Sequence, residues 1–265
     1  MAIIRKKPPL TLPEIRPNAG IERGHAKALL NIVQEIRSDI NKTLIDEFKK
    51  KARQEKMAMD GVSDWVAHVI DYLAYRWEKK LNVLAPDIAE SFVGRVVTNY
   101  DTLMRTHLKK AGFIVQFQIS QFQQDSLKAA IESNVGLIKS LASQYLERVQ
   151  GDVWRCVTAG YDLSDLTNAL ADGYGITRRR AAIIARDQSS KAHATIELAR
   201  RKELGITRAV WMHSHAGKVP RPSHVKANGK EFDISKGMYL DGEWVQPGQL
   251  PNCRCCSRSV IEGIE

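Results

Sequence analysis

The chain has 265 residues, of which 43% are hydrophobic and 26% are charged, a composition typical of a soluble protein with one large or two modest domains. It has no run of about 18 apolar residues, as a membrane helix needs, and no secretory apolar core at its start. Its four cysteines are too few for a disulfide scaffold. We therefore expect a protein that is kept in the cytoplasm, or in a particle assembled there. A net charge of +10 and a pI near 9.5 favour polyanionic partners, nucleic acid first, unless the charge is spread over solvated helix faces.

Residues 1–24 are predicted to form a flexible, basic, proline-rich arm. Its prolines exclude a helix and favour extended backbone. Such an arm either stays disordered or lies along a partner surface. Arg5, Lys6 and Lys7 at its start are candidate contacts for DNA or for a protein partner.

Residues 25–160 are predicted to be a helical region with one short strand element. From about His25, apolar residues recur at three- and four-residue spacing, and the pattern resumes after a break at Asp60-Gly61. Pro86 is predicted as the first residue of a third helix, which Gly112 ends. The apolar and β-branched residues near 113–119 predict the strand.

Residues 161–265 are predicted to form a compact, loop-rich α+β module. A helix begins at Ser164 and stops at Gly173, and a second, amphipathic helix runs from an N-cap at Thr177 to Gly205. TRAVWMH then alternates like a strand, and segments rich in Gly, Pro, Asn and Asp follow. The predicted fold class is therefore α+β, a mostly helical N-terminal region followed by this module.

A basic triplet, Arg178, Arg179 and Arg180, would lie in the first turn of that second helix, where positive charge opposes the helix dipole. A bound phosphate or an acidic partner would offset this cost. Solvation, or pairing with a neighbour such as Asp172, is the alternative. Together with the arm, the triplet is a candidate contact for DNA, and such binding would be non-specific and steeply salt-dependent.

Histidines and cysteines gather near the C-terminus, and five of them are candidate metal ligands: His213, His215, His224, Cys253 and Cys255. Imidazole nitrogen and thiolate sulfur are the ligands that structural zinc prefers, and a small loop-rich module gains stability from such a cross-link. Against zinc, the cysteines are spaced C-x-C rather than C-x-x-C, and the sequence offers no second pair.

Two other interpretations of these residues stay open. Arg221, His224, Asn252 and Arg254 could hydrogen-bond loop carbonyls and carboxylates and so hold the module together without a metal. Cys253 and His224 could also form a nucleophile and base. Because the sequence has no recognisable acid–base signature, phosphate loop or paired-carboxylate motif, a non-enzymatic protein is predicted.

The order of motifs from RRRAAIIARDQ to NCRCC resembles the C-terminal module of the phage Mu F-like head morphogenesis proteins, the minor head proteins of tailed bacteriophages. The resemblance covers roughly residues 176–256 and is carried by Arg186, Trp211, Arg221, Pro222, His224, Gly229, Pro247, Gly248, Asn252, Cys253, Arg254 and Cys255. His215 departs from it, since many members have an acidic residue there. The expected module-core motif is Arg186, Trp211, Arg221, His224, Gly229, Asn252 and Arg254.

The resemblance implies a minor head protein that acts in capsid or procapsid assembly and head morphogenesis. The implied partners are the portal protein, the major capsid protein, or both, and non-specifically the packaged double-stranded DNA, with which the chain could be ejected. No membrane is involved during assembly. The implied location is the virion, in the capsid interior or the portal region, after assembly in the host cytoplasm.

Two alternative functions are kept. One is a metal-dependent enzyme, nuclease-like or transferase-like, delivered with the DNA. The other is a zinc-stabilised, non-specific DNA-binding protein. The resemblance requires no cofactor, and structural zinc stays an open candidate.

Overall fold

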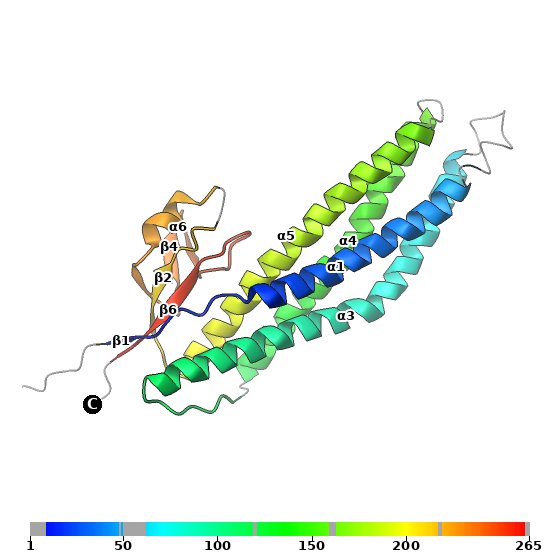
Figure 1. The fold of residues 1–265 in the computed structure, drawn as a ribbon. Coiled ribbons are helices and arrows are strands. Elements are labelled where there is room, and N and C mark those ends of the chain that lie inside the picture. The colour runs from blue at the N-terminus through cyan, green and yellow to red at the C-terminus, as the bar shows by residue number, and fades with distance from the viewer. Residues whose placement is uncertain are drawn as a thin grey trace, which may run out of the picture. The chain divides into compact units, whose positions relative to one another are not determined.

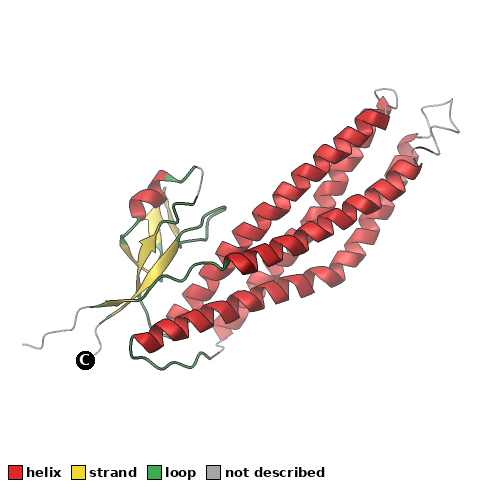
Figure 2. Cartoon of the chain, in the orientation of Figure 1, coloured by secondary structure: helices red, strands yellow, loops and turns green. Residues whose placement is uncertain are grey.

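The computed structural model describes residues 9–47, 49, 62–118, 121–158, 163–216 and 219–262 and confirms the α+β class (Figures 1 and 2). The chain forms two compact units, each assembled from separated segments. The module unit comprises Met1–Glu22, Ser91–Ile131 and Arg186–Glu265, and the helical unit comprises Arg23–Glu90 and Glu132–Ala185. These units differ from the sequence ranges predicted above, because long helices contribute residues to both.

Four long helices carry most of the described residues: α1 (Ala19–Ile40), α3 (Val62–Lys110), α4 (Gln121–Thr158) and α5 (Leu163–Glu203) (Figure 1). A short π-helical segment, η1 (Asn41–Ile45), directly continues α1. The expected break at Asp60-Gly61 lies outside the described residues. None of the described helices is long and apolar enough to cross a membrane.

Three predicted helix boundaries are wrong, because all three positions lie inside a longer helix. Pro86 is inside α3, where Leu81, Ala85 and Ala89 stay buried on one face. Proline removes one backbone hydrogen bond, and this continuous buried face retains the helix on both sides of it. Likewise, α5 continues through Gly173, and Thr177 is no N-cap, since its hydroxyl donates to the Gly173 carbonyl at 2.9 Å.

The helical unit buries one apolar face from each of its helical segments. Polar contacts fix the registers between them. The Trp77 indole and the Arg76 guanidinium on α3 both donate to Asp39 on α1, the indole at 2.9 Å. On α5, the Tyr174 hydroxyl contacts Gln34, and Arg180 donates to the Ser140 hydroxyl on α4 at 3.1 Å.

The module unit contains a four-stranded antiparallel sheet in the order β1-β6-β2-β3. The strands are β1 (Leu10–Thr11), β2 (Arg208–Met212), β3 (Glu231–Asp233) and β6 (Cys256–Ile261). A separate hairpin pairs β4 (Met238–Leu240) with β5 (Glu243–Val245), and a short helix, α6 (Pro222–Ala227), follows β2. Trp211 pairs with Ser257 and Met212 with Cys256, so Trp211 and Ser257 share one sheet face and Cys256 lies on the other.

The described part of the predicted arm is ordered, so flexibility was a wrong prediction for residues 9–18. β1 pairs with β6, and the Leu12 and Ile15 side chains are buried in the core. Residues 19–24 of the predicted arm belong to α1, so the expectation that the arm contains no helix is wrong there. α1 begins at Ala19 because the Asn18 side chain caps it, accepting the amide N–H of Gly20 at 2.8 Å. Arg5, Lys6 and Lys7 lie outside the described residues.

Residues 113–118 form neither a helix nor a strand, so the strand predicted near 113–119 is wrong over the part that the structure describes. Phe113, Val115 and Phe117 pack against the module unit's core, while Ile114 is 95% exposed. The alternating apolar residues therefore indicate that one side of this segment is buried. They do not indicate that the segment is hydrogen-bonded to a neighbouring strand.

Candidate functional site

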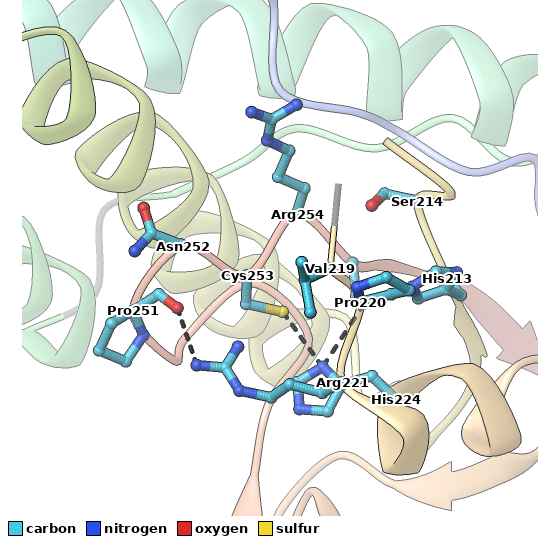
Figure 3. A pocket seen from close by; sticks show the side chains of 11 residues that line it. His213, Ser214, Val219, Pro220, Arg221, His224, Pro251, Asn252, Cys253 and Arg254 are labelled. Carbon is cyan, nitrogen blue, oxygen red and sulfur yellow. Dashed lines mark hydrogen bonds between the residues drawn. The ribbon is translucent and has the colours of Figure 1, made fainter. Parts of the chain in front are cut away.

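A pocket of about 270 Å³ opens in the module unit beside the N-terminus of α6 (Figure 3). Its walls come from the loop after β2, from α6 and from the loop before β6. The lining residues are His213, Ser214, Val219, Pro220, Arg221, His224, Pro251, Asn252, Cys253, Arg254 and Cys255. The structure therefore brings together most of the histidines, cysteines and arginines that the sequence singled out there.

His224, Cys253 and Cys255 form a buried cluster, called here the His-Cys-Cys cluster, in which the ligand atoms all lie within 4.8 Å of one another. The His224 Nδ1 atom is 3.5 Å from the Cys253 sulfur and 3.7 Å from the Cys255 sulfur (Figure 3). The other ring nitrogen, Nε2, is buried without a hydrogen-bond partner in the described part of the chain. The imidazole packs edge-on against Trp211, with ring centroids 5.2 Å apart.

The local sequence explains how the two arms of this cluster are held. Pro222 is the first residue of α6, where its fixed φ suits a helix, and His224 is the third residue of the same helix. In the loop before β6, Gly248 and Asn252 both have positive φ, at 83° and 58°. A Cβ on Gly248 would lie 3.2 Å from the Ser190 carbonyl oxygen on α5, so glycine lets this loop approach the helix.

Polar contacts brace the same loop from outside the cluster. Arg221 donates to the Pro251 carbonyl at 3.0 Å (Figure 3). Arg254 donates to the Ala216 carbonyl at 3.2 Å. The backbone amide of Asn252, not its side chain, donates to the Asp187 carboxylate on α5 at 2.7 Å. Arg221 and Arg254 thus donate to loop carbonyls, as one interpretation of the sequence expected. His224 instead contacts the two sulfurs, so the idea that the module is held together without a metal stays a prediction.

Electrostatics separate the two thiols of the cluster. A hydrogen bond from Cys255, backbone amides of Cys255 and Gly248, and the nearby His224 together lower the pKa of Cys253 to about 5, against the opposing effect of burial. The Cys253 sulfur and burial raise the pKa of Cys255 well above its usual range. The pKa values of the two neighbouring thiols are therefore shifted in opposite directions.

His213 and His215 contact each other instead of completing the cluster. Their Nδ1 atoms are 3.3 Å apart, and the rings meet edge-on at 4.5 Å. β2 ends at Met212, so both histidines lie beyond the strand, and His215 has a positive φ of 53°. Burial, His215 and His224 lower the pKa of His213, which lines the pocket and is favoured as a neutral imidazole.

The remaining predicted residues fall into two groups. Trp211 is fully buried, and Gly229, with φ of 79°, donates its amide N–H to the Trp211 carbonyl at 2.8 Å, so both shape the core beside the cluster. Arg186 lies away from the pocket and pairs loosely with Glu22 at 3.9 Å. Arg178 and Arg179 are exposed in the interior of α5, not in a first helical turn as predicted.

The sequence reasoning missed a buried network that joins α5 to β6. Arg201 donates to Glu197 at 2.8 Å, to the Ser257 hydroxyl at 2.7 Å and to the Ser259 hydroxyl at 2.8 Å, and all four residues are buried. A signal was present in the sequence, since Glu197 and Arg201 are spaced i,i+4 in a helix and serines alternate along the strand CSRSVI. Such spacing is also common on exposed helices, so burial could not be inferred from it.

Comparisons with known proteins place this cluster in a wider context. Residues 147–258 match the model of a family described as Phage Mu protein F like protein. An uncharacterized protein of Haemophilus influenzae is 33% identical over 187 residues, which cover 68% of this chain. The match covers 40% of that curated relative, so this chain spans well under two thirds of its length. No solved structure matches this chain significantly.

Proposed function

We propose that this chain, which matches the model of the Phage Mu protein F like family over residues 147–258, is a minor head protein of a tailed bacteriophage. The family supports a protein of phage head morphogenesis that is associated with the virion. The observation that carries the proposal is that the matched segment includes the whole His-Cys-Cys cluster and both bracing arginines, Arg221 and Arg254. The module unit then supplies a stable body, and the helical unit supplies a docking surface.

Exposed aromatic residues on α3 are the best candidates for that docking surface. Tyr72 and Tyr75 are 54% and 57% exposed, and Val83 further along the helix is exposed as well. The period of the helix places all three within one face. Arg76 and Lys79 lie over the two tyrosine rings, at 5.8 and 4.5 Å from the ring centroids. Tyrosine and arginine are enriched in protein interfaces, which favours a protein partner such as the portal or the inner capsid wall.

Co-expression with the portal and major capsid proteins of its phage tests the proposal. We expect the chain to co-purify with procapsids. We also expect the double variant Tyr72→Ser and Tyr75→Ser to lower the copies per particle by about fivefold or more, because interface tyrosines carry much of the binding energy. Quantitative mass spectrometry of purified particles measures this. Tyr239→Ser, an equally exposed tyrosine in the module unit, is the matched control.

The same experiment can contradict the head-assembly proposal in two ways. The chain could be absent from particles, or procapsids containing Tyr72→Ser and Tyr75→Ser could retain the wild-type copy number. Electron cryo-microscopy of intact particles separates positions at the portal, at the capsid wall and among the DNA. Particles that assemble normally with His224→Asn but fail after DNA entry would favour an enzyme delivered with the DNA.

Contact with packaged DNA is the second part of the proposal, and the described structure leaves two of the candidate arginines available for it. Arg178 and Arg179 are exposed on α5, where Arg178 lies 5.6 Å from the Tyr174 ring centroid. Arg180 instead turns toward α4, bonds Ser140 and is partly buried, and burial lowers its pKa. The net charge of +10 adds a favourable long-range attraction for DNA.

Binding to random-sequence duplex DNA at several salt concentrations tests this contact. Replacing Arg178 and Arg179 by glutamine should reduce the slope of log K against log salt by roughly two, because each phosphate contact releases about one counterion. Lys109→Gln with Lys110→Gln removes the same charge from two exposed residues at the end of α3 and should leave the slope unchanged. Salt-insensitive binding, or none, would exclude this part of the proposal.

We also propose that the chain acts without catalysing a reaction. A nucleophilic cysteine works with a base that is itself oriented by a third group. In the described structure His224 Nε2 has no such partner, and both sulfurs contact the same Nδ1 atom. Cys253 is also 4% exposed, which limits the access of a substrate to its sulfur. These contacts favour a structural role for the cluster.

A further inference from the structure

We propose that His224, Cys253 and Cys255 bind one Zn²⁺ ion, which cross-links α6 to the loop before β6. The proposal is independent of head assembly, since it concerns the contents and stability of the module unit alone. The geometry of the cluster, its buried surroundings and the positions of the ligands in the fold all support it.

The distances between the ligand atoms suit a tetrahedral ion. Tetrahedral zinc, with bonds of about 2.3 Å to sulfur and about 2.0 Å to nitrogen, separates a nitrogen ligand from a sulfur ligand by about 3.5 Å. The two separations here, from His224 Nδ1 to the sulfurs of Cys253 and Cys255, are 3.5 and 3.7 Å. Both edges therefore already have the length that a shared tetrahedral ion requires. Only a small adjustment of the side chains would bring the ion to its usual bond lengths.

The ligand atoms are buried and have few other polar partners. All three residues are buried, and the described structure gives His224 no polar contact other than the two sulfurs. The buried Trp211 indole N–H has no hydrogen-bond partner in the described part, and its ring packs edge-on against the His224 imidazole. A divalent cation allows both sulfurs to be thiolates at once.

The ligands come from two segments that are far apart in the sequence. His224 and Cys253 are 29 residues apart, and β3 and the β4-β5 hairpin lie between them. One ion would therefore close a loop that contains about half of the small module's strands, and metal binding would add directly to its folding free energy. The cluster residues line the pocket described above, so we assign a water molecule from that pocket as the fourth ligand. Cys256 is excluded, because it lies on the opposite sheet face.

Metal analysis of the full-length chain, purified in zinc-supplemented buffer without chelator and then desalted, tests the proposal. We expect about one zinc per wild-type chain, and less than about 0.2 in Cys253→Ser and in Cys255→Ser, because each variant leaves only two protein ligands. Cys256→Ser, a buried cysteine next to the cluster, is the matched control and should retain the wild-type zinc content. Substitution with Co²⁺ should give thiolate-to-cobalt absorption in the wild type and in Cys256→Ser only.

A second measurement needs no variant, so it holds even if the serine variants fail to fold. Wild-type protein is treated with N-ethylmaleimide with and without a chelator, and the modified cysteines are mapped by mass spectrometry. Chelation should raise the labelling of Cys253 and Cys255 by about tenfold or more, with Cys156 unchanged, since metal-bound thiolates are protected. Zinc below about half an equivalent in the wild type, equal loss of zinc in Cys256→Ser, or labelling that the chelator does not change would each overturn the proposal.

Discussion

Replacing Arg201 by methionine is expected to lower the free energy of unfolding by about 3–5 kcal/mol, the largest effect of any single change considered for this chain. The guanidinium is 3% exposed and Glu197 is 5% exposed, so removing the arginine leaves a buried carboxylate without its countercharge. The hydroxyls of Ser257 and Ser259 lose their arginine donor at the same time. The damage lies where α5 contacts β6. Urea unfolding at pH 7, followed by tryptophan fluorescence, measures the change.

Two comparisons identify the cause of that loss. The double variant Glu197→Met with Arg201→Met removes both charges, so it should recover at least about 2 kcal/mol relative to Arg201→Met alone. The exposed pair Arg208–Glu231 is the matched control, and Arg208→Met should cost less than about 1 kcal/mol. If Arg201→Met and Arg208→Met destabilised the chain equally, the buried network would have no special role in its stability.

The second large effect is loss of stability in mild acid through His193. Its Nε2 bonds the Ile15 carbonyl at 2.8 Å, and burial lowers the pKa of this histidine from 6.5 to about 4. The unfolded chain therefore binds more protons than the folded chain between these two values, so stability is complete above pH 6.5 and falls as the pH drops toward 4. A shift of this size corresponds to about 3 kcal/mol.

Unfolding free energies measured between pH 7 and pH 4 test this, with His193→Gln as the comparison. Glutamine keeps a donor for the Ile15 carbonyl but cannot titrate. The unfolding free energy of the variant should therefore fall less steeply with decreasing pH, by about 1.4 kcal/mol per pH unit between the folded and unfolded pKa values of His193. Burial also lowers the pKa of His25, in the helical unit, to about 4, so some acid sensitivity should persist in the variant. Identical pH profiles for the two proteins would rule out titration of His193 as a cause.

Both effects concern the module unit, whose integrity the proposed head-assembly role requires. The arm that was expected to reach a partner is instead built into this unit over residues 9–18, where Ile15 accepts the His193 bond. A variant that loosens His193 or Arg201 would thus weaken the attachment of β1 or β6 without touching the pocket. Reduced incorporation of such variants into particles would reflect stability, and the exposed Tyr72 and Tyr75 variants separate that cause from docking.

Several elements were predictable from sequence because their signals are local. Gly112 and Gly205 take positive φ just after α3 and α5, as expected for glycines that end helices, and TRAVWMH contains the strand β2. Pro86 and Gly173 failed as helix ends because packing along a continuous buried face outweighs the small local preference of one residue. The strand near 113–119 failed because a one-sided apolar pattern reports burial and not strand pairing.

By itself, the sequence determined the α+β class, the helix-rich composition, the order of motifs that marks the family, and the set of imidazoles and thiols from which a site could be built. Only the tertiary structure decided that His224 meets Cys253 and Cys255 while His213 turns to His215, and that Arg201 is buried. The physical reason is that burial and long-range contact depend on how α5, α6 and the loop before β6 pack together. Residue types and spacing set what each side chain can bind, and packing sets which partners it finds.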